Sequence, residues 1–253
     1  MKNRSFLSRL TSGVLLVLIW QVLGMIINND VFLPTPVQTG TTMINQLFED
    51  EFIKSLLYTF NRLVFSFIIA LLSTVFLTFF SRKLRYIQIM IEQVLLVIRI
   101  IPTAAFILIA LIWLGRDRSV LLISIIVMVP LMYDQLTHRL HEIDDKYRDT
   151  LFLYGDTFLE NIKRVYIPLS LNSFYTICKS ASLLGLKVIV TSEVIVSIQY
   201  GLGKDMSIAS RIDLNNVRLF ADTGWILLFS IGISYIFDFL IRQAKNQELE
   251  NGK

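Results

Sequence analysis

The chain has 253 residues, of which 54% are hydrophobic and 17% are charged, and its formal net charge is +4 at pH 7. A soluble domain needs a polar shell and rarely carries this apolar content, so the composition indicates a membrane protein. Lys and Arg gather in the loops instead of forming one basic face, which argues against a nucleic-acid partner. The single cysteine, Cys178, excludes an intramolecular disulfide.

Six apolar segments are candidates for crossing a bilayer, which takes roughly 20 mostly apolar residues in a helix. In chain order they are 10–27, 63–80, 87–114, 120–136, 170–196 and 223–241. The first follows a basic start but has no small-residue cleavage site, so we interpret it as an uncleaved span. The third contains Arg99 and Pro102, and the fifth contains Lys187 and Glu193. The sequence therefore predicts an all-α bundle of about six transmembrane helices.

The distribution of Lys and Arg predicts the orientation of this bundle. With the N-terminus in the cytoplasm, the inner segments hold about twice as many Lys and Arg residues as the outer segments. Six spans then leave both termini inside. The longest inner connection is 137–168, and the longest outer connection is 28–61, with a rigid extended turn at 33–36.

The inner segment 137–168 is expected to form a short helix–turn–helix at the membrane face. Its first helix ends at Gly155, and Asp156 or Thr157 can cap the second. Pro168 ends the second helix and opens the next span. The pair exposes three large apolar side chains beside charges, which is typical of a docking site for another protein: Leu151, Tyr154 and Phe158.

The same segment resembles the EAA loop of ABC importer permeases. That loop reads Glu-Ala-Ala, three residues, Gly, nine residues and a four-residue end with Pro. This chain has Asp149-Thr150-Leu151, three residues, Gly155, nine residues, and then 165–168 with Pro168 at its end. The Gly-to-Pro spacing matches, whereas Asp replaces Glu and Thr-Leu replaces Ala-Ala.

Further segments extend the resemblance over nearly the whole chain, toward the nitrate/sulfonate/taurine-type branch of these permeases. They are 33–36, 55–62, 99–102, 113–115, 192–195 and 201–203. The resemblance implies a type I (MetI-like) permease fold. It divides the chain into an N-terminal span with its external loop (1–53), a permease domain (54–243, with the EAA loop at about 144–168) and a cytoplasmic tail (244–253).

The resemblance also implies partners and a location. Two copies of the chain would form the pore in the bacterial inner membrane, surrounded by lipid. Two separate ABC ATPase subunits would bind ATP and Mg beneath them, and an external solute-binding protein would deliver the substrate, a small organic anion of the sulfonate or nitrate kind or a vitamin precursor. The residues that would contact the ATPase are Asp149, Thr150, Leu151, Tyr154, Gly155, Asp156, Thr157, Phe158 and Pro168. The chain itself has no G-x-x-x-x-G-K-[ST] phosphate loop, so we expect a transport subunit without enzymatic activity or cofactor of its own.

Ionisable groups at membrane depth are costly and are therefore candidates for the substrate pathway or a gate. The candidates are Arg99 with the neighbouring Pro102, Lys187 and Glu193. Arg99 either faces the pathway or the dimer seam, or pairs with a carboxylate such as Glu92 or Glu193. Lys187 either favours an anionic substrate or pairs with a carboxylate, and Lys179 is expected to reach toward the cytoplasmic end.

Two other classes of protein remain as alternatives. An ion-gradient-driven secondary transporter or channel would show inverted repeats, and none is evident. A membrane-embedded enzyme would need a nucleophile, a metal set or paired carboxylates in the spans, and none is visible in the sequence. His138 and His141 have the spacing of metal ligands but lack further partners, so we expect a solvated helix end and no metal site.

Overall fold

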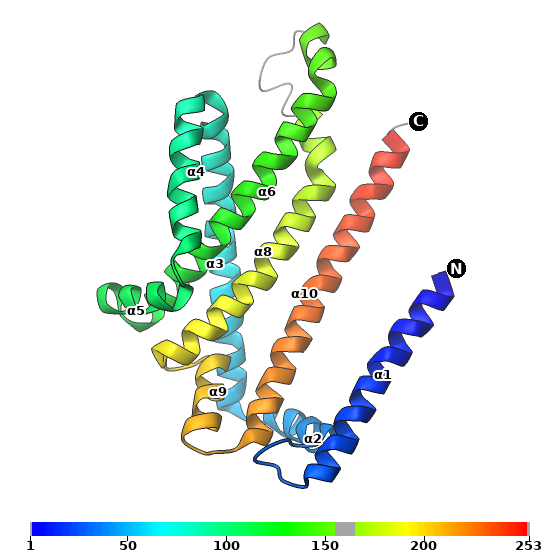
Figure 1. Ribbon diagram of the computed structural model, residues 1–253, viewed down its shortest axis with the longest axis vertical. Helices are drawn as coiled ribbons and strands as arrows, with labels where there is room; N and C mark the ends of the chain where they lie inside the picture. The colour runs from blue at the N-terminus through cyan, green and yellow to red at the C-terminus, as the bar shows by residue number, and fades with distance from the viewer. Residues whose placement is uncertain (1, 155–164, 252–253) are drawn as a thin grey trace. The chain divides into compact units, whose positions relative to one another are not determined.

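The computed structural model in Figure 1 describes residues 2–154 and 165–251, and the side chains of residues 11–147 and 165–245. Within these residues every regular element is a helix, which confirms the predicted all-α class. The helices are α1 (Lys2–Ile27), α2 (Pro36–Gln46), α3 (Asp50–Lys83), α4 (Arg85–Ile100), α5 (Thr103–Leu114), α6 (Arg116–Tyr154), α8 (Ile167–Val196), α9 (Leu202–Arg211) and α10 (Asn216–Asn251).

Among the described residues, three helices are long and apolar enough to cross a membrane: Asp50–Lys83, Arg116–Tyr147 and Asn216–Lys245. They contain the second, fourth and sixth predicted spans. The first predicted span corresponds to a shorter apolar helix, Thr11–Ile27. The fifth forms the 30-residue helix α8, which contains three charged side chains: Lys179, Lys187 and Glu193.

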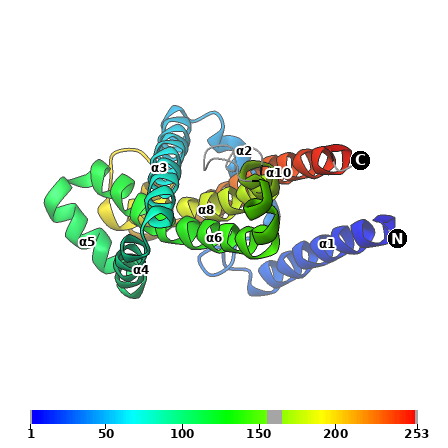
Figure 2. The same ribbon diagram turned by 90° about the horizontal axis from the view of Figure 1, so that it is seen from above.

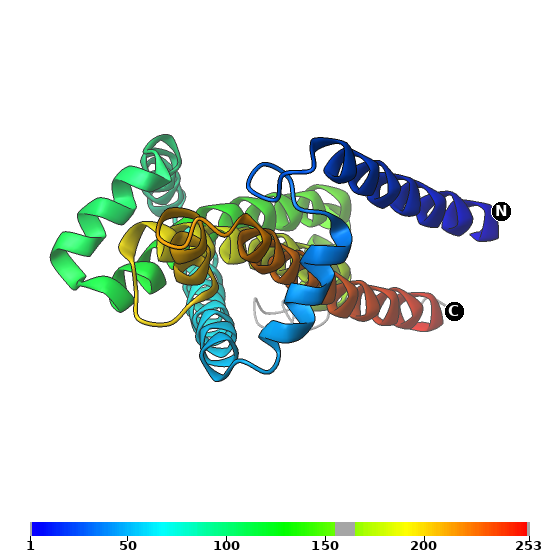
Figure 3. The same cartoon turned by 90° about the horizontal axis from the view of Figure 1, so that it is seen from below.

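The third predicted span, 87–114, needs a correction because the chain breaks there into two helices. Helix α4 ends at Ile100, Ile101 is extended (φ −71°, ψ 128°), and α5 begins at Thr103. The two helices meet at 98°, and the sharp corner between them is visible in Figure 3. Pro102 causes the break, because proline lacks an N–H and disfavours helical backbone in the residue before it. The pair forms a broken span or a re-entrant segment instead of one straight helix.

The chain packs as two compact units, which we describe separately. Unit 1 comprises Met1–Thr59 and Ser197–Phe229, and unit 2 comprises Phe60–Val196 and Ser230–Lys253. These units follow packing and do not test the predicted division at 1–53, 54–243 and 244–253, which stays a prediction.

In unit 1 the extended turn at 33–36 leads directly into α2. The Thr35 hydroxyl accepts the Gln38 N–H (3.3 Å), and the Gln38 side-chain oxygen accepts the Thr35 N–H (2.8 Å). This reciprocal cap satisfies two helix-end donors, and Pro36 fits the first helical position because no N–H is needed there. The indole N–H of Trp20 donates to the Pro34 carbonyl (2.9 Å), which ties α1 to the turn.

In unit 2 the core forms where α6 and α8 pack side by side, as Figure 2 shows. Its buried members include Met128, Met132, Tyr133, Ile177, Cys178 and Ala181. Gly185 of α8 makes the close approach possible. A Cβ atom added there would lie 2.5 Å from the Met128 sulfur and 3.3 Å from a Leu63 methyl group.

We therefore expect Gly185→Val to lower the melting temperature of the purified protein. The added atoms would overpack a buried contact, at a cost of about 1–3 kcal/mol. The matched control is Gly232→Val in α10, where a Cβ atom would meet nothing within 4 Å. Equal melting temperatures for the two variants would contradict the close approach of α6 and α8.

Candidate functional site

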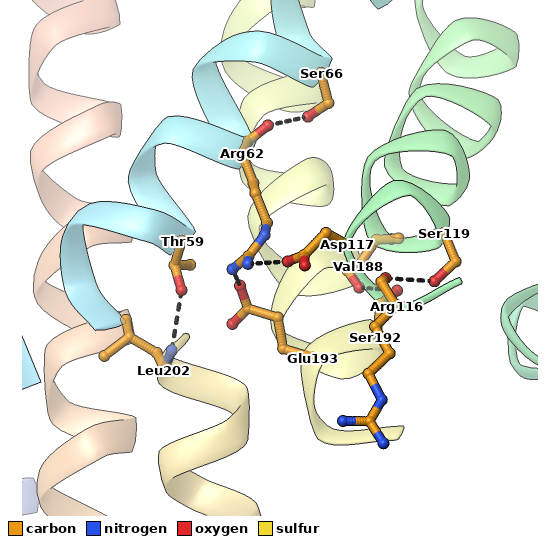
Figure 4. Close-up of polar contacts among 10 residues, drawn as sticks. All are labelled: Thr59, Arg62, Ser66, Arg116, Asp117, Ser119, Val188, Ser192, Glu193 and Leu202. Carbon is orange, nitrogen blue, oxygen red and sulfur yellow. Dashed lines mark hydrogen bonds and ion pairs between the residues drawn. The ribbon is translucent and has the colours of Figure 1, made fainter. Parts of the chain in front are cut away.

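A buried ion network joins three helices of unit 2 (Figure 4). Arg62 of α3 donates through one guanidinium nitrogen to Glu193 of α8 (2.9 Å) and through the other to Asp117 in the first turn of α6 (2.6 Å). The Glu193 side chain is 0% exposed and that of Arg62 is 8% exposed, whereas Asp117 is 66% exposed. The planar fork of an arginine suits this arrangement because it can serve two carboxylates at once.

The burial of Glu193 makes its ion pair with Arg62 important for the packing of unit 2. An unpaired carboxylate removed from water is very costly, so the pair must form for α8 to pack against α3. Sequence reasoning proposed Glu193 as a site residue but gave Arg62 no partner. A single Arg at the start of an apolar run was the signal that could have found it.

Arg99, another predicted site residue, lies in the last turn of α4. It forms an ion pair with Asp134 of α6 and donates to the Pro130 carbonyl (3.0 Å). Arg99 therefore pairs with a carboxylate, as one of the two interpretations expects, but the carboxylate is Asp134 and not Glu92 or Glu193. Glu92 instead accepts a hydrogen bond from Gln88 (2.8 Å). The sequence alone does not show which residues of α4 and α6 lie opposite each other, so it could not identify Asp134 as the partner of Arg99.

The Arg99–Asp134 pair lines a cavity of about 280 Å³ at the corner between α4 and α5. Ile101 and Thr103 also line it, on either side of Pro102, so the helix break opens onto this space. Leu184 of α8 reaches the same cavity. The pair is partly exposed, with 39% of the Arg99 side chain and 48% of the Asp134 side chain accessible.

Helix α8 presents two contrasting faces. One face is buried, with Cys178, Gly185 and Glu193 against the rest of unit 2. The opposite face carries exposed or half-buried polar side chains, all within about 60° of one another around the helix: Thr176, Ser180, Lys187 and Thr191. Within the described part of the chain, Ile167 is the one large apolar side chain of α8 that is exposed, whereas α1, α3 and α10 expose many.

Lys187 lies in the middle of this polar face, which we call the α8 polar face. It is exposed and forms no ion pair with any side chain that the structure describes. Lys179, by contrast, forms an ion pair with Asp238 of α10 (2.7 Å). The sequence instead predicts that its side chain extends toward the cytoplasmic end of the span. Leu184, which lines the Arg99 cavity, precedes Lys187 by one turn, so the cavity borders this face.

The predicted docking loop is only partly described. Helix α6 continues to Tyr154, so Asp149, Thr150, Leu151 and Tyr154 are helical, in line with the predicted first helix. Gly155, Asp156, Thr157 and Phe158 lie outside the described residues. Pro168 is the second residue of α8, which is where the sequence predicts that the next span opens.

The two histidines bring no further ligands together. His138 faces Glu142 across one helical turn (3.4 Å), on a well-exposed stretch of α6. Among the described residues no group of three or more His, Cys, Asp or Glu side chains is arranged to hold a metal ion.

Comparisons with known proteins agree with the architecture. No protein-family model matches the sequence, and no curated protein matches it. A solved chain of the MetNI methionine ABC transporter, in an inward-facing conformation, superposes with a TM-score of 0.62 at 15% sequence identity. The match covers 80% of this chain and 98% of that chain. The chain therefore has the MetI-like fold of type I ABC importer permeases, as the sequence predicts.

The ion network predicts an asymmetry between single and double substitutions. Arg62→Met should destabilise the protein by about 3–5 kcal/mol, because it removes the opposite charge from the buried Glu193 carboxylate. The double variant Arg62→Met with Glu193→Leu should be more stable than Arg62→Met alone. Asp117→Asn is the control, with a small effect because Asp117 is largely solvated. Melting temperatures of these variants and the unmodified protein test this, and a double variant that is no more stable than Arg62→Met alone would contradict the pairing.

Proposed function

We propose that this chain is the permease subunit of an ATP-driven ABC importer in the bacterial inner membrane. The observation that carries the proposal is the MetI-like fold over 80% of the chain, combined with the EAA-like spacing from Asp149 to Pro168. Fold alone does not define function. The loop adds a reason for a partner, since it ends α6, precedes α8 and offers apolar side chains for docking.

The division of labour follows from this proposal. Two copies of the chain form the translocation pathway, and two separate ATPase subunits bind ATP and Mg. An external binding protein supplies the solute. Closure of the ATPase pair moves the cytoplasmic loop, and the loop moves the helices to which it is joined. Both termini then lie in the cytoplasm, in agreement with the Lys and Arg distribution.

The α8 polar face supports a pathway along this helix. A lipid-facing surface would be apolar, and a charge at membrane depth faces water, a partner charge or a cavity. Lys187 on this face and Arg99 in the adjoining cavity are positively charged, and Asp134 in the same cavity is negatively charged. These three side chains together give the pathway a net positive charge. We therefore propose a small organic anion as substrate, with a vitamin precursor as the other class that the resemblance allows. The nitrate/sulfonate/taurine-type branch finds no support in the methionine transporter and rests on the sequence segments alone.

The loop is the part of this proposal that a single substitution can test. The complex is purified through its ATPase subunit and reconstituted in lipid, and vanadate-sensitive ATP turnover is measured. We expect Gly155→Trp to abolish co-purification or coupled turnover, because the bulky ring blocks the close approach that glycine permits. Gly232→Trp, on an exposed position of α10, controls for the bulk of the ring. If the unsubstituted chain does not co-purify with an ATPase subunit and uptake instead follows an ion gradient, the chain is a secondary transporter and the proposal fails.

A further inference from the structure

A second polar cluster lies at the opposite ends of the same three helices that the Arg62 network joins. Arg82 is in the last turn of α3, Asp144 is on α6, and Tyr166 immediately precedes α8. One Arg82 guanidinium nitrogen lies 3.0–3.1 Å from the two Asp144 carboxylate oxygens and donates to the Tyr166 hydroxyl (3.0 Å). The Tyr166 hydroxyl in turn donates to Asp144. Each member of the cluster therefore contacts the other two.

The cluster is packed as well as hydrogen-bonded. The Arg82 guanidinium carbon lies 4.7 Å above the centre of the Tyr166 ring, which adds a cation–π contact. Tyr166 is 9% exposed, and the side chains of Arg82 and Asp144 are 19% and 32% exposed. Burial, and then the hydrogen bond to Asp144, raise the pKa of the Tyr166 hydroxyl above its usual value, so it stays a neutral donor.

Two of the cluster's three residues, Asp144 and Tyr166, lie at positions in the chain that flank the EAA-like segment or belong to its end. Asp144 and Tyr166 are 22 residues apart, and the EAA-like segment from Asp149 through Gly155 to residue 165 lies between them. Tyr147 is non-helical (φ −114°, ψ 17°), so α6 bends three residues after Asp144. The cluster thus lies on the membrane side of this bend and joins the two ends of the loop to each other and to α3. A second tie supports it, since Arg139 of α6 donates to the Leu169 carbonyl in the first turn of α8 (2.9 Å).

We propose that Arg82, Asp144 and Tyr166 form a clamp that makes the coupling loop transmit motion to the membrane helices. The inference rests on the proposed function. If the two ends of a loop could move apart, a push from the ATPase would be absorbed by spreading those ends. With the ends clamped together on α3, the same push moves α3, α6 and α8 as one body. The three residues are positioning residues and contact neither substrate nor nucleotide.

The test separates the transmission of motion from the assembly of the complex. A cysteine is introduced on the α8 polar face as Thr191→Cys, and the native Cys178 is buried. Proteoliposomes of the complete complex are loaded with Mg-ATP, with or without vanadate, and an external membrane-impermeant maleimide reports access to the cysteine. In the chain with an intact clamp, vanadate trapping is expected to raise the labelling rate as the pathway opens outward.

Two variants break the clamp, and one neighbour serves as the control. Tyr166→Phe removes one hydroxyl and keeps the ring, and Arg82→Gln removes the charge. Each should reduce the vanadate-induced rise about fivefold, as expected for the loss of a typical hydrogen bond, while ATP turnover persists. Lys83→Gln removes the same charge one residue away, where the ammonium group contacts Phe79 instead, and should keep the full rise.

The outcomes distinguish the clamp from the proposed function. A full rise in Tyr166→Phe and Arg82→Gln overturns the clamp and leaves the importer proposal standing. A loss in Lys83→Gln equal to that in Arg82→Gln also overturns the clamp, because the effect would then follow from charge alone. If trapping causes no rise in the intact chain, the proposed function fails and the clamp fails with it. If the complex with Arg82→Gln does not assemble, Tyr166→Phe, which removes only one oxygen atom, still tests the clamp.

Discussion

A charge at membrane depth must be paired or must face water, and this constraint organises helix α8. Glu193 is held by Arg62, and Lys179 is held by Asp238, so two of the three charges of α8 tie it to α3 and α10. Lys187 has no such partner among the described side chains and lies with hydroxyl groups on the face opposite the core. The same helix therefore supplies both the anchorage of unit 2 and a polar surface suited to a water-filled pathway.

The Arg62 network and the Arg82 cluster are built from the same three helices in the same way. Each contains one arginine of α3 and one acid of α6, with its third member on or immediately before α8. Arg62 and Arg82 are 20 residues apart, about 30 Å along the helix, which is close to the thickness of the hydrocarbon core. Between the clusters, Gly185 lets α8 approach Met128 and Leu63 closely. Three helices joined by two ion clusters and packed between them form a stiff body, and the EAA-like segment follows Asp144 in the chain.

The apolar runs and the helix-breaking residues predicted most of the helices. They did not predict which charged side chains pair with one another. The uncharged run 63–80 and the run 223–241, whose one charged residue is Asp238, identify their helices, and Pro102 marks the break between α4 and α5. The angle of that break depends on packing, so 87–114 reads as one span in the sequence. Arg99 pairs with Asp134 and Arg62 pairs with Glu193 because antiparallel helices bring distant residues together, which spacing along one helix cannot reveal. The EAA-like spacing indicated a coupling loop, and its central residues lie outside the described part of the chain.

The central claim is that the α8 polar face lines a water-filled pathway, and a cysteine scan of the reconstituted complex tests it most directly. Single cysteines replace Thr176, Ser180, Lys187 and Thr191, and exposed apolar positions of α10, Leu228 and Ile231, serve as controls. A membrane-impermeant thiol reagent should modify the four α8 positions and leave both α10 positions unmodified. If the α8 positions are as unreactive as those of α10, this face is dry, and the account of the pathway is contradicted.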